Sequence, residues 1–149
     1  MGVDHEIVPC DPALAETAAF CEAYGYSPDD SANTIIVVGK GEVPRPVACI
    51  VLASSRLDVN GVVRRRLEVR KASFASADET MQLTGMEIGG VTAFALPEDL
   101  PIWIDAAVMA RQRIILGGGS RSIKVLTPPS TLALLDGATV VDDLARPRE

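Results

Sequence analysis

The chain has 149 residues, of which 48% are hydrophobic and 23% charged, and its net charge is −6. A chain of this length can bury enough surface to fold without a disulfide or a metal, so we expect a single domain over residues 1–149. No apolar stretch approaches the ~20 residues that span a bilayer, and the acidic start lacks the features of a secretory signal. The sequence therefore predicts a cytoplasmic protein without membrane contacts.

Histidine and cysteine usage limits the possible chemistry. The sequence contains one histidine, His5, and three cysteines. A Ser-His-Asp triad would have to use His5, and a zinc site would need ligand spacings that are missing here. The odd cysteine count argues against a disulfide framework and favours buried thiols. We expect no metal and no cofactor, and any catalysis must proceed without a histidine base.

The first half of the chain predicts a helix, a helical turn and a hairpin. Asp11 and Pro12 are typical of a helix start, and Gly25 is typical of a helix end. Residues 27–30 repeat the start signal for a shorter turn. The β-branched run 34–38 and the apolar segment 47–52 then predict two buried strands, joined by a turn at 39–42.

The second half alternates helical and strand signals. Residues 56–67 predict a helix that Gly61 weakens, and a capping box at 76–79 begins a helix over 77–84 that Gly85 ends. Strands are predicted at 101–104, 114–116, 123–126 and 139–141, with a helix start at 127–129 and a frayed tail from 146. This order predicts an α+β domain with a mixed, curved, barrel-like sheet and flanking helices. Its expected core contains Ile35, Val37, Ile50, Ile102, Ile104, Ile115 and Val125.

Basic side chains cluster in spite of the net negative charge. A phosphate-binding surface needs Lys and Arg, and these concentrate between residues 64 and 71, with Arg121 and Lys124 as further candidates. A solvated helix face explains the same cluster equally well. The charge pattern alone leaves both interpretations open.

Four short motifs follow one another in the second half of the chain. They are a Thr-Gly step at 84–85, a Gly-Gly-Val-Thr turn at 89–92, an apolar strand that closes on Asp105, and the glycine turn 117–119. This set resembles the YbaK/ProX family of aminoacyl-tRNA deacylases. Each motif is weak alone, but their order covers about residues 6 to 144. The resemblance implies an editing-type fold that hydrolyses the ester of tRNA mischarged with a small amino acid. The implied partner is the acceptor end of aminoacyl-tRNA, and an aminoacyl-tRNA synthetase is a further candidate.

The resemblance also assigns roles to residues of this sequence. The candidate catalytic residues are Gly89, Gly90 and Asp105. The candidate substrate-binding residues are Asn33, Thr34, Thr84, Thr92, Gly117, Gly118 and Gly119. The candidate tRNA-binding residues are Arg64, Arg65, Arg66 and Lys71. Ester hydrolysis needs little more than a positioned water and donors for the oxyanion, and glycine amides can approach a carbonyl closely.

Two departures from the family pattern leave alternatives open. Asn33 stands where the family usually has a lysine, and Thr92 is followed by Ala93 where the family usually has proline. An amide cannot replace a point charge, so a non-catalytic tRNA- or nucleotide-binding module is the main alternative to an enzyme. An accessory interaction domain is a third hypothesis. The glycine turns could also be ordinary turns, and Asp105 could simply cap a following helix.

Overall fold

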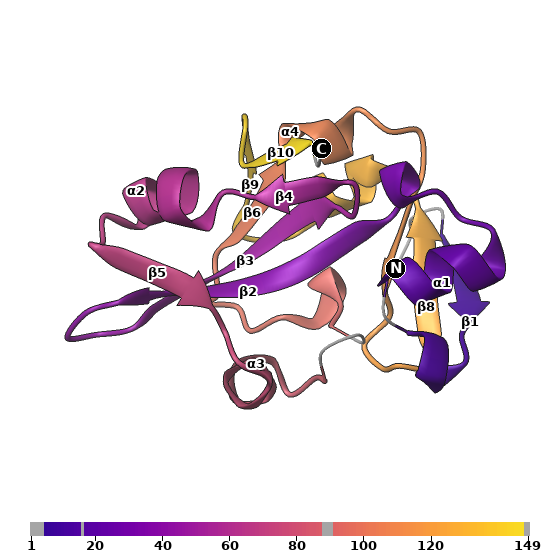
Figure 1. Ribbon diagram of the computed structural model, residues 1–149, viewed down its shortest axis with the longest axis horizontal. Coiled ribbons are helices and arrows are strands. Elements are labelled where there is room, and N and C mark those ends of the chain that lie inside the picture. Colours follow the sequence, from indigo (N-terminus) through magenta and orange to yellow (C-terminus); the bar gives the residue numbers. More distant parts are fainter. Residues whose placement is uncertain (1–4, 16, 88–90, 148–149) are drawn as a thin grey trace.

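The computed structural model describes residues 5–15, 17–87 and 91–147 (Figure 1). The helices are α1 (Thr17–Tyr24), α2 (Arg64–Leu67), α3 (Ala77–Thr84) and α4 (Ala106–Met109). The strands are β1 (Glu6–Pro9), β2 (Ala32–Lys40), β3 (Arg45–Leu52), β4 (Ser55–Leu57), β5 (Lys71–Phe74), β6 (Ile102–Asp105), β7 (Ile114–Gly117), β8 (Ile123–Thr127), β9 (Ala138–Val141) and β10 (Ala145–Pro147). Short 3₁₀ segments occur at Pro12–Leu14, Pro28–Asp30, Ala93–Ala95 and Pro129–Leu134, and a π-helical turn at Val59–Val63.

The described residues form three sheets. The largest has the strand order β5-β2-β3-β6-β9, with antiparallel pairing around β2 and parallel pairing on both sides of β6. A second sheet, β1-β8-β7, lies beside α1, and β4 and β10 form a two-stranded ribbon. The α+β prediction with a mixed sheet and flanking helices is confirmed. The sheets formed by the described residues do not close into a barrel.

Strand alternation divides the core into two layers. Ile36, Ile50 and Ile104 point to the face that packs against α4, β7 and β8. Val37, Cys49 and Trp103 point to the other face, which is covered by the π-helical turn, α2 and the carboxyl-terminal segment. Figure 1 shows α2 and α3 on opposite sides of the sheet. Neighbouring residues of one strand therefore serve two separate surfaces.

The expected core is confirmed at six positions. Residues 37, 50, 102, 104, 115 and 125 are buried. Ile35 is only partly buried, because it lies where one edge of β2 has no neighbouring strand. The capping box of α3 is also confirmed: Ser76 and Glu79 each accept a hydrogen bond from the other's backbone N–H, and Gly85 ends the helix with φ of 73°.

Two predicted helices are shorter than expected. The segment 11–25 starts as a 3₁₀ turn over Pro12–Leu14, and the α-helix begins only at Thr17. The segment 56–67 starts as strand β4, because its backbone pairs with β10. Helical structure begins after Asp58, whose carboxylate accepts hydrogen bonds from the Gly61 and Val62 amides. Tertiary pairing thus overrides a weak helix signal.

The prediction of a frayed tail is wrong for residues 146 and 147. Both belong to β10, which pairs with β4 across the ribbon.

The sequence also predicts that the chain does not span a membrane. Within the described ranges, no helix is long and apolar enough to cross a bilayer.

Candidate functional site

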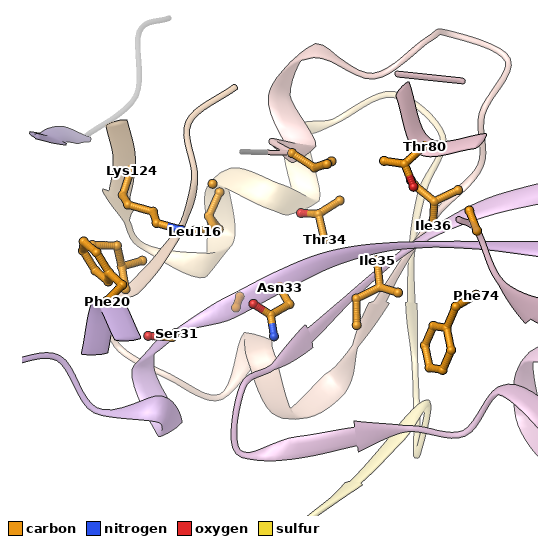
Figure 2. Close-up of a pocket in the computed structure, with 15 residues that line it drawn as sticks. Phe20, Ser31, Asn33, Thr34, Ile35, Ile36, Phe74, Thr80, Leu116 and Lys124 are labelled. Atoms are coloured by element: carbon orange, nitrogen blue, oxygen red, sulfur yellow. The ribbon is translucent and has the colours of Figure 1, made fainter. Parts of the chain in front are cut away.

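A cavity of about 300 Å³ opens along one edge of β2 (Figure 2). Ser31 forms a bridge to Ile115 of β7, and pairing with β5 begins at Val37. Between these points that edge of β2 pairs with no other strand in the described part of the chain. We call this cavity the edge pocket. Its lining includes Ser31, Thr34, Ile36, Thr80, Leu116 and Lys124.

The backbone of β2 presents hydrogen-bonding groups to the edge pocket. The Ala53 amide donates to Ser31 O at 2.8 Å on the β3 side, whereas the Ala75 amide donates to Ile36 O at 2.9 Å on the other side. Because backbone groups alternate along an antiparallel strand, the N–H and C=O of Thr34 point to the open edge. A ligand in the pocket can therefore bond to β2 as a strand would.

The Thr34 side chain adds an unused hydroxyl. Thr34 Oγ1 is buried and has no hydrogen-bond partner. Figure 2 shows it on the same side of β2 as Ile36, Thr80 and Leu116. A buried hydroxyl without a partner costs about 1–3 kcal/mol, so such groups are uncommon in folded proteins. The Thr34 hydroxyl is thus available to a ligand.

Asn33 lies on the opposite side of β2 from Thr34. Figure 2 shows Asn33 and Ile35 projecting together, with Phe74 beside them. All three still border the pocket, because it wraps around the strand edge. Asn33 therefore lines the pocket as expected, but from the face that carries α2 and not from the face of the Thr34 hydroxyl.

Lys124, a further candidate for phosphate binding from the charge pattern, lies in the edge pocket. It is 7% exposed and lies on β8 directly opposite Gly117. Its Nζ donates to Ala15 O at 2.7 Å and lies 5.2 Å from the centre of the Phe20 ring. The charge pattern does not indicate its burial, whereas its place as a lone lysine inside the apolar run 123–126 does, and buried lysines are rare.

The glycine turn contributes to the pocket through Gly117, which lines it. At the other two positions, the backbone geometry itself requires glycine. A Cβ on Gly118 would lie 2.6 Å from Ile123 Cγ1 and 2.8 Å from its carbonyl oxygen, and Gly119 has φ of 100°. These two positions require glycine for the tight β7–β8 hairpin. Their substrate-binding role stays a prediction.

Thr84 and Thr92 use their hydroxyls locally. Thr84 Oγ1 donates to Thr80 O at 2.7 Å and accepts from the Met86 amide at 3.1 Å. Thr92 Oγ1 accepts from the Phe94 amide at 3.3 Å, and its methyl group lies 3.6 Å from the position of a Cβ on Gly119. Neither residue lines the edge pocket. Gly89 and Gly90 lie outside the described residues.

Asp105 is separate from the edge pocket. It is buried at the end of β6, on the face that packs against the carboxyl-terminal segment. Burial raises its pKa, while backbone N–H groups of Ala145 and Leu144 favour the charged form and oppose the rise. Its Oδ2 atom has no hydrogen-bond partner. The structure brings Asn33, Thr34 and Gly117 together but does not bring Asp105 to them.

The candidate arginines lie on the Asn33 side of the sheet with α2, whereas Lys71, which pairs with Lys40 in the β2–β5 register, projects from the Thr34 side. Arg64, Arg65 and Arg66 belong to α2, and Arg66 stacks over Trp103 with 5.2 Å from its guanidinium carbon to the ring centre. Lys71 begins β5 and is exposed. None of the four lines the edge pocket, and no group of described His, Cys, Asp and Glu residues is arranged to hold a metal ion.

The fold is an α+β domain with a cavity at an open edge of β2. The sequence model of the aminoacyl-tRNA editing domain matches residues 11–133. The chain belongs to this family.

The chain is also similar to curated proteins and to solved structures. An uncharacterized Bacillus subtilis protein, YwhH, is 23% identical over 96% of this chain and 88% of its own. Proline–tRNA ligase of Bacillus licheniformis is 31% identical over 73% of this chain, which spans 18% of the ligase. The structure of a hypothetical protein superposes with a TM-score of 0.83 at 24% identity, over 95% of this chain and 91% of the other.

A further structure has the same fold. It is described as a candidate trans-editing enzyme for prolyl tRNA synthetase, and it superposes with a TM-score of 0.80 at 23% identity. The superposition covers 97% of this chain and 87% of that one. At this level of identity the likeness establishes the fold.

Proposed function

We propose that residues 1–149 form one editing unit that hydrolyses, in trans, the ester bond of tRNA mischarged with a small amino acid. The observation that carries the proposal is the buried, unpartnered Thr34 hydroxyl at an unpaired strand edge, in a chain of the editing-domain family. A built pocket with an unused polar group is typical of a ligand site.

The dimensions and lining of the edge pocket fit this substrate. Its volume of about 300 Å³ is at the lower end of the range for small-molecule sites, which favours a small ligand. Ile36, Val91 and Leu116 supply apolar surface for a short side chain. The backbone N–H and C=O of Thr34 would pair with the polar groups of the aminoacyl ester.

In this proposal the pocket hydrolyses the ester by positioning a water and by stabilising the negative charge that develops on the carbonyl oxygen. A water held by the Thr34 hydroxyl attacks the ester carbonyl, the acyl–oxygen bond breaks, and the ribose oxygen leaves with a proton. The developing oxyanion accepts hydrogen bonds from a β2 edge amide, and the Lys124 ammonium adds positive charge nearby. No histidine base is needed, because the ribose hydroxyl is a competent leaving group.

The choice of substrates to test comes from the relatives. One relative is a proline–tRNA ligase and one structural neighbour is described as a candidate editing enzyme for prolyl tRNA synthetase. We therefore propose that mischarged tRNA for proline is the first substrate to test, and that a synthetase is a candidate partner.

The experiment compares single-turnover deacylation by the native protein and by Thr34→Val on tRNAs carrying different small amino acids. Valine keeps the shape of threonine and removes only the hydroxyl. We expect the rate to fall by roughly tenfold to a hundredfold, since a lost water-positioning or donor group costs about 1.5–3 kcal/mol. Thr139→Val is the matched control, because Thr139 is exposed on β9, which β3 and β6 separate from β2, and does not line the edge pocket.

A non-catalytic tRNA-binding module is the second candidate, and Asn33 favours it. The family lysine is absent at this position, so a charge contact to the RNA is lost. If the native protein binds mischarged tRNA but deacylates none of the panel, this second candidate replaces the first. The catalytic roles expected of Gly89, Gly90 and Asp105 remain predictions.

A further inference from the structure

A second concavity lies on the Asn33 side of the fold. Its volume is about 720 Å³, and it is formed by β4, β10, the start of the π-helical turn and the end of β5. We call it the arginine groove. Its lining includes Arg56, Asp58, Asn60, Phe74, Arg146 and Pro147.

Two arginines face each other across the β4–β10 ribbon. Arg56 and Arg146 are direct partners in the antiparallel register, so their side chains project from the same face of the ribbon. Like charges in directly opposite positions destabilise a strand pair. Both side chains are exposed and both line the groove. Such a pair is suited to an anionic ligand that bridges the two guanidinium groups.

The acidic side chain in the groove offsets this charge only in part. Asp58 Oδ2 lies 3.6 Å from Arg146 Nη2. The same carboxylate also accepts backbone hydrogen bonds from Gly61 at 3.1 Å and from Val62 at 3.3 Å. One carboxylate is thus shared among two amides and one arginine, and the pair of arginines keeps a positive excess.

Phe74 connects the arginine groove to the edge pocket. It is 57% exposed and lines both concavities. It projects on the same side of the sheet as Asn33 and Ile35 (Figure 2). An exposed aromatic ring beside a cationic groove is the arrangement that binds unpaired nucleotides, because any base can stack on it.

We propose that the arginine groove binds the single-stranded 3′ end of an RNA. Arg56 and Arg146 contact backbone phosphates, and Phe74 stacks on a base. Asn33 lies beside the path along which the terminal ribose reaches the edge pocket. This inference rests on the proposed function, because it supplies the RNA side of the same substrate. In this arrangement Asn33, on one face of β2, is directed to the RNA, and Thr34, on the other face, is directed to the acyl group.

Binding of a fluorescently labelled RNA hexamer tests the groove directly. Affinity is measured by fluorescence anisotropy over a salt series for the native protein, for the double variant Arg56→Gln/Arg146→Gln, and for Arg113→Gln. Arg113 is a matched control, since it is exposed, pairs with Glu6 at 3.9 Å and lines neither concavity. We expect the double variant to bind at least tenfold more weakly and to lower the salt slope by about 1.4 units, or 0.7 for each lost phosphate contact.

Substitutions at Phe74 separate stacking from charge. Phe74→Leu is expected to weaken hexamer binding roughly tenfold without changing the salt slope. Phe74→Trp, which keeps an aromatic ring, is expected to bind the hexamer as tightly as the native protein. Because Phe74 is exposed, neither substitution disturbs the core, and thermal melting checks that the variants are folded.

Hexamer affinity and salt slope equal to native in the double variant would overturn the inference, as would equal binding by Phe74→Leu. Deacylation by the native protein distinguishes the two proposals. If the groove variants deacylate tRNA as fast as the native protein, the proposed function holds and the RNA-binding role of the arginine groove is wrong. If RNA binding depends on the groove residues but the native protein deacylates no tRNA, the RNA-binding role of the groove is supported and the proposed deacylase activity is contradicted.

Discussion

Replacing Lys124 with methionine tests whether a buried cation supports the edge pocket. Methionine has nearly the same length and keeps the apolar part of the side chain, so Lys124→Met removes the ammonium with little change in packing. The native ammonium donates to Ala15 O at 2.7 Å and lies over the Phe20 ring at 5.2 Å. Ala15 is fully buried, so no solvent replaces the lost donor.

These contacts set the expected loss of stability. A hydrogen bond from a charged donor contributes about 1.5–3 kcal/mol, and a partly desolvated cation–π contact about 0.5–2 kcal/mol. We expect Lys124→Met to lower the free energy of unfolding by about 2–4 kcal/mol, which corresponds to roughly 5–15 °C in melting temperature for a domain of this size. Combining Lys124→Met with Phe20→Leu in a double-mutant cycle isolates the cation–π part.

The assay is urea unfolding, followed by single-turnover deacylation at a temperature where both proteins are folded. If Lys124 also faces the substrate, the folded variant should lose at least tenfold in rate. Native stability in Lys124→Met would refute the energetic reasoning, because the Ala15 and Phe20 contacts would then contribute nothing. Native activity in the folded variant would show that the ammonium has only a structural role.

Four further predictions concern Asn33, the arginines of α2, Asp105 and Gly118. Asn33→Lys should raise deacylation tenfold or more if Asn33 is a degraded catalytic position, and should be neutral or harmful if the native site already works, which single-turnover rates decide. Neutralising Arg64–Arg66 together should weaken tRNA binding and lower its salt slope; unchanged values would assign them to a solvated face. Because the pKa of Asp105 is raised on folding, the native protein should gain stability relative to Asp105→Asn as pH falls from the folded-state pKa to the ordinary one, and urea unfolding without that trend would contradict the assignment. Gly118→Ala should destabilise by about 1–3 kcal/mol, because its Cβ meets the Ile123 backbone; native-like melting would show that the hairpin relaxes.

Local sequence determined the elements whose cause lies within a few residues. The helix over Ala77–Thr84 is bounded by Ser76 and Gly85. The sequence predicts both ends, because capping involves groups only three or four positions apart. The β2–β3 hairpin and the burial of Val37 and Ile50 follow from apolar runs in the same way. The order of motifs along the chain was sufficient to indicate the editing-domain family.

Tertiary structure alone decided how the site is assembled. The pleat of any strand sends the neighbours Asn33 and Thr34 to opposite faces, but only the register of β2 in the sheet decides which face each one takes, because a shift of one residue would exchange them. Strand order left one edge of β2 open next to β7, and β8, which pairs with β7, brings in Lys124 from far along the chain. Pairing across the β4–β10 ribbon turned an expected frayed tail into one side of the arginine groove. These features depend on contacts between distant segments, whose register no local pattern specifies.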